Sequence, residues 1–186
     1  MRPRTLPGLL ALGALALGLV AACKGPAVPN PLNGQTRYLC CNLHYEKPHI
    51  SDVNFQQGAL IPFGTQVRIL EVRGDSVKFE AAGNPPIQLD LRYGRKFIGF
   101  DQYLDRVFVT TDPRTHLKKV PAKVVKLIEQ GSVEPGMTRE QVLMALGYPP
   151  AHRTPNLDAP EWHYWQNRWH QFVVYFDGDK VSRIQS

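Results

Sequence analysis

The stretch GMTREQVLMALGYPP, residues 136–150, decides the fold of the last third of the chain. Thr138 stands where the N-cap of a helix is expected, and Gln141, three residues later, completes a capping box. Met137 precedes the cap and Val142 follows it at the spacing of a hydrophobic staple. The stretch therefore predicts a helix with a well-defined first turn.

This helix also has a clear end, and a second helix precedes it. Gly147 and then Pro149 stand where a helical chain stops. Upstream, AKVVKLIEQ (residues 122–130) has helical periodicity. Its apolar face is formed by Val124, Leu127 and Ile128. We therefore expect two short helices, connected by a turn that contains Gly136.

An aromatic segment, EWHYWQNRWHQF, follows the helices at residues 161–172. Side chains alternate between the two faces of a strand, so Trp162 and Tyr164 share one face. His163 and Trp165 then share the other face. The chain continues as HQFVVYFD and KVSRIQS, with DGD between them as a turn. We therefore expect three antiparallel strands.

The length of the first hairpin loop determines which aromatic residues meet. An odd loop, such as residues 167–169, pairs Tyr164 with Phe172. It also pairs Trp162 with Val174. An even loop would exchange the two faces. We choose the odd loop because it places the apolar positions under the helices and leaves both histidines outside the core.

This register defines a second set of residues, which we name the outer sheet face. Its members are His163, Trp165, Gln171, Val173 and Tyr175. The set is too apolar for a sheet face in contact with water. Either the preceding part of the chain covers it or a partner does, unless the exposure is simply tolerated. We predict it as the candidate interaction face.

The pattern of helices, glycines and aromatic strands resembles the BamE (SmpA/OmlA) domain family over residues 123–186. The matching positions are Gly136, Met137, Thr138, Val142, Leu146, Gly147, Pro149, Trp162, Tyr164, Phe176, Val181 and Ile184. The resemblance implies two helices on one face of a three-stranded antiparallel sheet. It also implies a small lipoprotein accessory to the β-barrel assembly machine of the outer membrane, acting through protein contacts and association with anionic phospholipid.

The amino terminus has the features of a lipoprotein signal peptide over residues 1–22. Arg2 and Arg4 precede an apolar run that ends in LVAAC, which resembles the bacterial lipobox. Cleavage would make Cys23 the first residue and the site of lipid attachment, and several acyl chains there would anchor the protein stably. Lys24 follows instead of the Asp that retains lipoproteins in the inner membrane. We therefore expect an outer-membrane protein that faces the periplasm.

Between anchor and BamE-like segment we expect three further regions. Residues 23–35 are rich in Pro and Gly and predict a tether. Residues 36–110 predict short strands at intervals of about ten residues, with a short helix at FDQYLDRVF, and weakly resemble an SH3-like barrel. Residues 111–122 form a polar junction, and residues 123–186 are the BamE-like domain. The fold class is therefore α+β.

Adjacent cysteines, Cys40 and Cys41, lie in the predicted strand RYLCCNLHY. Two readings remain open at this point. They are either small free thiols, at least one of them buried, or a vicinal disulfide, which an oxidising periplasm permits. The spacing is not that of a metal site.

The sequence lacks the signatures of catalysis and of nucleic-acid binding. It has no H-E-x-x-H, G-x-S-x-G or Walker-type motif. His44, Glu46 and His49 could bind a metal, but we expect a solvated strand end instead. The formal charge of +6 falls to +4 once Arg2 and Arg4 are removed, which is too small an excess to indicate nucleic acid. We expect no enzyme activity, cofactor, metal or nucleic-acid partner.

Two functions from different classes fit these features. The first is a non-enzymatic accessory factor in outer-membrane assembly or envelope maintenance, with outer-membrane assembly proteins or another envelope protein as partners. The alternative is a periplasmic module that binds a ligand, peptidoglycan or an enzyme through the aromatic sheet face.

Overall fold

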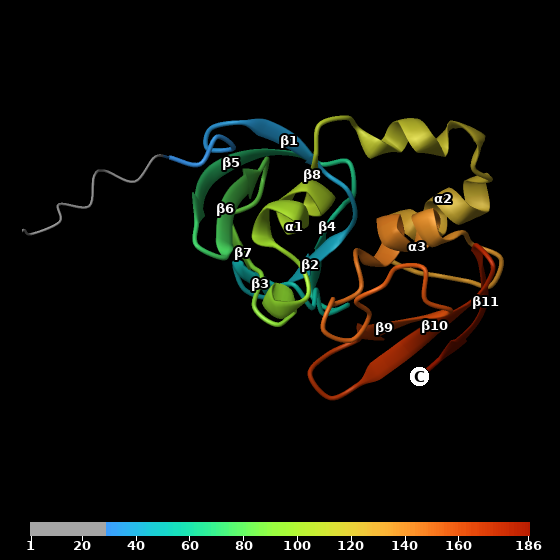
Figure 1. Ribbon diagram of the computed structural model, residues 1–186. Helices are drawn as coiled ribbons and strands as arrows, with labels where there is room; N and C mark the ends of the chain where they lie inside the picture. Colours follow the sequence, from blue (N-terminus) through green and yellow to red (C-terminus); the bar gives the residue numbers. More distant parts are fainter. Residues whose placement is uncertain (1–28) are drawn as a thin grey trace, which may run out of the picture.

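The computed structural model describes residues 29–186 (Figure 1). The predicted signal peptide and the lipid attachment site at Cys23 lie outside the described residues. The strands of the N-terminal part are β1 (Thr36–Leu39), β2 (Leu43–Tyr45), β3 (His49–Ser51), β4 (Ala59–Ile61), β5 (Gln66–Arg73), β6 (Ser76–Ala81), β7 (Ile87–Asp90) and β8 (Phe108–Val109). One α-helix, α1 (Phe100–Val107), and a 3-10 turn, η1 (Gly94–Lys96), complete this part.

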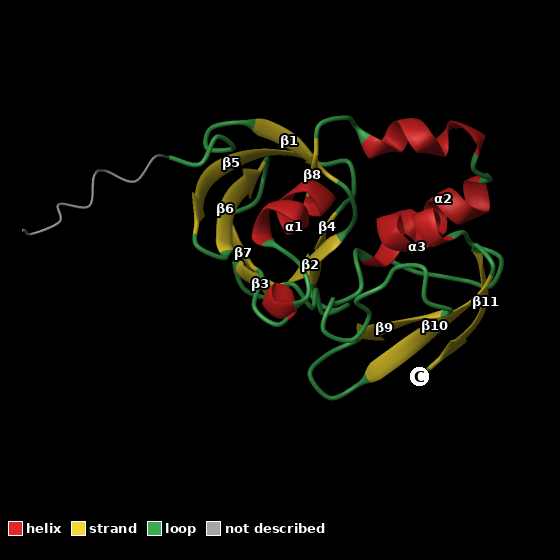
Figure 2. Cartoon of the chain, viewed as in Figure 1, coloured by secondary structure: helices red, strands yellow, loops and turns green. Residues whose placement is uncertain are grey.

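Six of these strands form one curved sheet in the order β3-β7-β6-β5-β1-β8, and β2 pairs with β4 separately (Figure 2). The sheet is antiparallel except for the parallel pair of β3 and β7. Val67 and Ile69 point into the core, and a bulge follows Ile69. Leu104 of α1 is buried in the same core, as the predicted helix requires.

The segment RYLCCNLHY is two strands and not one. The chain bends at Cys40 and Cys41 between β1 and β2, and the two cysteines form a vicinal disulfide. The reading as free thiols is therefore wrong, although Cys41 is buried as expected. β7 ends at Asp90, and Tyr93, three residues later, is 46% exposed.

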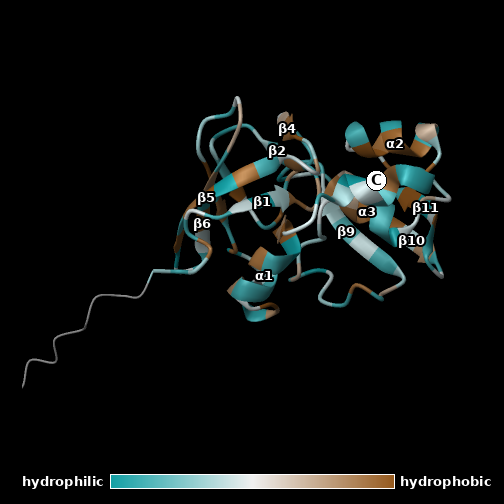
Figure 3. Ribbon diagram, turned by 90° about the horizontal axis from the view of Figure 1, so that it is seen from above, coloured by the Kyte–Doolittle hydropathy of each residue, from teal (hydrophilic) through white to brown (hydrophobic). Residues whose placement is uncertain are grey.

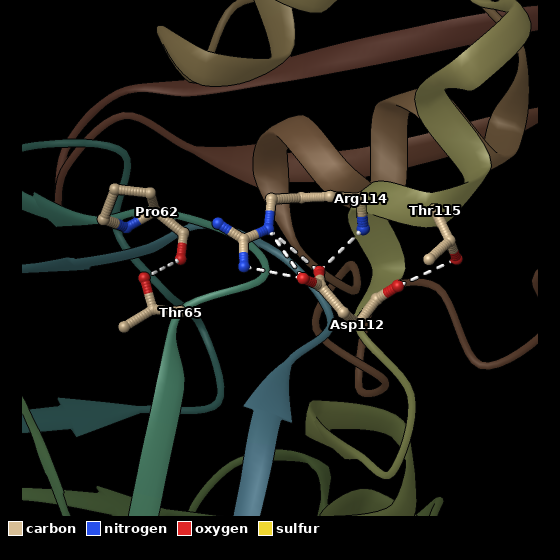
Figure 4. A network of polar contacts seen from close by, with 5 residues as sticks. All are labelled: Pro62, Thr65, Asp112, Arg114 and Thr115. Carbon is tan, nitrogen blue, oxygen red and sulfur yellow. Dashed lines mark hydrogen bonds and ion pairs between the residues drawn. The ribbon is translucent and has the colours of Figure 1, made fainter.

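The polar junction contains a 3-10 helix, η2 (Pro113–Lys119). Asp112 caps its first turn by accepting from the backbone N–H of Arg114, and it also pairs with the Arg114 guanidinium at 2.6 Å (Figure 4). These contacts hold the pKa of Asp112 below its ordinary value, mainly through the side-chain hydrogen bond from Arg114. The Arg114 side chain lies against Gly64, in the turn between Pro62 and Thr65. The junction is thus ordered and packs on the N-terminal part.

The C-terminal part has two helices and three strands in the predicted order. They are α2 (Ala122–Glu129), α3 (Arg139–Leu146), β9 (Glu161–Trp165), β10 (Gln171–Asp177) and β11 (Lys180–Gln185). Figure 1 shows α2 and α3 on one side of the sheet formed by β9, β10 and β11. Both halves of the Thr138–Gln141 capping box are present, and Gly147 ends α3 with a φ of 82°. The predicted α+β fold is confirmed.

The hairpin has the predicted odd register. Tyr164 lies opposite Phe172, and Trp162 lies opposite Val174. Trp162 and Tyr164 are each 1% exposed, in a core with Val142 and Ile128 under the helices. Burial raises the pKa of Tyr164 well above its ordinary value, and its hydroxyl donates to the Gly147 carbonyl at 3.0 Å.

Three buried amide side chains join the two parts, which lie side by side in Figure 3. Asn42, fully buried, donates to the carbonyls of Ile128 and Ala145 at the ends of α2 and α3. Asn54 and Gln56 both donate to the Leu146 carbonyl. These carbonyls lie in the last turns of helices, where no intrahelical donor is available. We name the three residues the amide seam. It fixes the helices of the C-terminal part against the N-terminal sheet.

The apolar cores interlock across the seam as well. Phe63, from the N-terminal part, is buried in the core beneath α2 and α3. Ala151, from the loop after α3, belongs to the core of the N-terminal part. None of the helices within residues 29–186 is both long and apolar enough to cross a membrane.

Candidate functional site

The register of β9 and β10 places all five predicted residues on the outer sheet face. Gln171 lies opposite Trp165, and Val173 lies opposite His163. Tyr175 lies opposite Glu161. Gln171 is exposed and the other four predicted residues are half-buried. The face is therefore shared between the chain's own contacts and solvent.

Residues from both parts of the chain cover the end of this face near Trp165. The His152 ring lies 5.5 Å from the Trp165 ring and 5.6 Å from the Tyr93 ring, centroid to centroid. The three rings form a stack that runs from the N-terminal part, through the loop after α3, to β9. Gln56 adds a backbone hydrogen bond to the Trp165 carbonyl at 3.0 Å. Intramolecular docking thus accounts for the burial of Trp165.

The middle of the face is occupied by polar neighbours outside the predicted set. Arg183 of β11 lies over the Tyr175 ring, 3.5 Å from its centroid. His163 pairs with Glu161 at 3.2 Å, and its backbone N–H donates to Thr154. Cross-strand pairing could have indicated Arg183, because β11 places it opposite Tyr175. These contacts leave Gln171 and the Arg183–Tyr175 pair as the part of the face available to a partner.

Two histidines at the boundary between the two parts, His44 and His152, are partly buried. Burial lowers the pKa of His152, an effect that Asp52 opposes and Arg153 reinforces. Burial also lowers the pKa of His44. Within the described residues, His152 Nδ1 and both ring nitrogens of His44 are buried without a hydrogen-bond partner. Both rings are therefore favoured in the neutral form, and His44 is not the solvated strand end that we expected.

The residues that match the family motif stabilise the fold of the C-terminal part. The Gly136 N–H donates to Val181, Met137 is buried, and Pro149 is buried after the Gly147 stop. The Trp162 indole donates to Leu157 at 3.0 Å. Arg139 at the start of α3 donates to Leu157 and Ala159, and its guanidinium lies 4.2 Å from the Phe176 ring centroid. These residues build the domain and do not form a reactive constellation.

Outside the predicted face, the structure has an open cleft of about 530 Å³ beside the β9–β10 loop. We name it the loop cleft. One wall comes from residues 44–57 and from Arg92 and Tyr93, and the other comes from residues 167–169. Trp169, in the second wall, is 81% exposed. In the sequence, Trp169 is part of the predicted hairpin loop and has no other signal.

No group of three or more metal-ligating side chains clusters within residues 29–186. His49 is paired with Asp90 at 2.6 Å, and Glu46 accepts from Gln57. His49 and Glu46 are therefore engaged by other side chains, and the ring nitrogens of His44 are buried.

Comparison with known proteins identifies one segment of the chain. Residues 123–186 match the family model described as "Outer membrane protein assembly factor BamE domain". Searches of the curated proteins and of the solved structures found no match. The matched range starts in α2 and includes α3 and the three-stranded sheet with its outer face. The C-terminal third of this chain therefore matches the BamE domain family.

Proposed function

We propose that this protein is a lipoprotein of the outer membrane, anchored through acyl chains on Cys23, with its folded part in the periplasm. Its BamE domain acts as a protein-interaction module in the assembly of outer-membrane β-barrel proteins or in envelope maintenance. The family match over residues 123–186 carries this proposal, because the family described is one of outer-membrane assembly factors. The lipobox-like LVAAC before Lys24 supports the anchor and its location.

The geometry supports a binding role and not a catalytic one. The titratable groups on the outer sheet face are paired or stacked, as His163–Glu161 and Arg183–Tyr175 show. Gln171 and the Arg183–Tyr175 pair form a mixed polar and aromatic surface at the unpacked side of the sheet. Aromatic and arginine side chains are common where protein partners bind tightly.

Two experiments test the proposal. Affinity purification of the full chain from solubilised membranes should recover barrel-assembly components or other outer-membrane proteins, and recovery of neither would refute the partner class. Cys23→Ser should move the chain from the membrane fraction to the soluble fraction. A Cys23→Ser chain that still sediments with the outer membrane would refute the acyl anchor.

A further inference from the structure

The loop cleft is formed by two fixed walls that come from opposite ends of the chain. On the N-terminal side, the buried Asp52 carboxylate accepts hydrogen bonds from three successive backbone N–H groups, those of Arg92, Tyr93 and Gly94, at 2.7–3.0 Å. This arrangement holds Arg92 and Tyr93 at the cleft.

The opposite wall is fixed in a similar way. The Asn167 side-chain oxygen accepts from the backbone N–H groups of Trp169 and His170 at 2.9 and 3.1 Å. The Gln166 side chain donates to the Gln56 carbonyl at 2.7 Å, which ties this loop to the N-terminal part. Trp169 is therefore presented by an ordered turn although its ring is exposed. The backbone of this turn therefore has little conformational entropy to lose when the ring binds a partner.

The cleft carries an excess of positive charge. Lys47, Arg92 and Arg168 line it, and none of the ion pairs found within residues 29–186 involves them. Glu46 is the one carboxylate among the lining residues, and it is engaged by the Gln57 amide at 3.0 Å. The Arg92 guanidinium lies over the Tyr93 ring, 5.4 Å from its centroid, and keeps its N–H donors for an anion. A ligand that offers carboxylates would therefore find cations without a carboxylate partner on both walls.

Aromatic side chains lie between these cations. Trp169 and Tyr93 are the most exposed, and Tyr45 and Phe55 also line the cleft. Trp, Tyr and Arg are the residues most enriched where protein partners bind tightly. The cleft is also lined by β3, the terminal strand of the six-stranded sheet, whose outer side pairs with no other strand in the described part of the chain. An edge strand can hydrogen-bond an extended peptide.

From these observations we infer that the loop cleft binds an extended, acidic segment of a partner protein that also carries an aromatic residue. Its carboxylates pair with Arg92, Arg168 and Lys47, and its aromatic side chain packs on Trp169. This inference rests on the proposed function as a protein-interaction module, and it assigns that function a second surface and a chemical class of partner.

The test uses the full chain in detergent and a fluorescein-labelled, twelve-residue peptide built from Glu, Ser and one Phe. The control peptide has Gln in place of every Glu. Fluorescence anisotropy should show binding of the acidic peptide that weakens as NaCl is raised, because exposed charge pairs are screened by salt. Binding of the Gln peptide should be at least about tenfold weaker, since it lacks the charge-assisted pairs.

Variants locate the site. Arg92→Glu/Arg168→Glu should lower the affinity for the acidic peptide at least about tenfold, and Trp169→Ala about fivefold. The matched control Lys119→Glu/Lys126→Glu makes the same change in net charge with two exposed residues outside the cleft, and it should change the affinity less than about twofold. Circular dichroism confirms that each variant is folded.

Equal losses in the cleft variant and the control variant would overturn the inference. Tighter binding of an oligogalacturonate of equal charge, or of phosphatidylglycerol vesicles, would also overturn it in favour of an acidic glycan or a lipid surface. Neither result would change the affinity purification from membranes, so failure of this inference is distinguishable from failure of the proposed function.

Discussion

Replacement of Asn42 with alanine should destabilise the whole folded unit, because this side chain joins its two parts. Its amide donates to Ile128 at 2.6 Å and to Ala145 at 2.9 Å, and its oxygen accepts from the Phe63 N–H at 2.9 Å. Ile128 keeps a second donor, the N–H of Gly131. The Ala145 carbonyl and the Phe63 N–H have no other protein partner among the described hydrogen bonds.

The expected loss follows from these two groups. A buried donor or acceptor left without a partner costs about 1–3 kcal/mol. Two such groups therefore lower the free energy of unfolding by about 2–6 kcal/mol, and we expect about 4 kcal/mol. With a urea slope of about 2 kcal/mol per M, the unfolding midpoint should fall by about 2 M.

Urea unfolding followed by circular dichroism measures this change, and amide hydrogen exchange at Phe63 reports it locally. Asn42→Asp should be at least as damaging, because a carboxylate cannot donate to the two carbonyls and would be buried as a charge. Asn156→Ala is the matched control, since the exposed Asn156 side chain accepts only from the Asp158 N–H, and its loss should cost less than about 1 kcal/mol. Equal losses for Asn42→Ala and Asn156→Ala would refute the role of the amide seam.

Three further predictions concern stability. Lowering the pH from about 6.5 to 5 should lower the urea midpoint, because burial lowers the pKa values of His44 and His152 and the unfolded chain then binds more protons than the folded chain. His44→Gln/His152→Gln should flatten the dependence of the urea midpoint on pH. An unchanged dependence in this variant would contradict the prediction. Thr138→Ala should cost about 1 kcal/mol in urea unfolding through loss of the helix cap, and Thr138→Ser should recover most of it. Gly147→Ala should cost more than Thr138→Ala, because φ is 82° and the new Cβ would lie 2.9 Å from the Asn54 amide nitrogen; a smaller loss would contradict this ranking.

Local patterns predicted the C-terminal fold because each signal is short-range and several agree. The Thr138 cap and the Gly147 stop fix α3 from neighbouring residues alone. Strand alternation, together with the need to bury Trp162 and Tyr164, selects the hairpin register. The N-terminal part was predictable as β-rich for the same reason, since Val67, Ile69, Val77 and Phe79 alternate along their strands and are buried.

The relation between the two parts could not be predicted in this way. The amide seam consists of polar residues that usually occupy surface loops. The acceptors of the two bonds that the Asn42 amide donates lie 86 and 103 positions further along the chain. Burial of an amide is favourable only when its partners are in place, so the sequence gives no local signal of it. The bend at Cys40 and Cys41, which ends β1 early, leads the chain to Asn42 at the helix ends.

The residues of the outer sheet face could be predicted, but the residues that cover them could not. The five residues of the outer sheet face follow from register alone. Their coverage depends on His152 and Arg183, which reach the face through a loop and through the third strand. Trp169 lies in a loop, where no sequence periodicity applies. The cleft beside it forms only because the fold brings residues 44–57 close to this loop.

Photocrosslinking in living cells from Gln171 tests whether the outer sheet face binds an outer-membrane assembly partner. This residue is exposed on the outer sheet face, opposite Trp165, so a photoactivatable residue there leaves the stack with His152 intact. Lys126, exposed on α2 on the other side of the sheet, is the control position. A barrel-assembly component or another outer-membrane protein should be captured from Gln171 and not from Lys126. Capture from neither position, or equal capture from both, would contradict it.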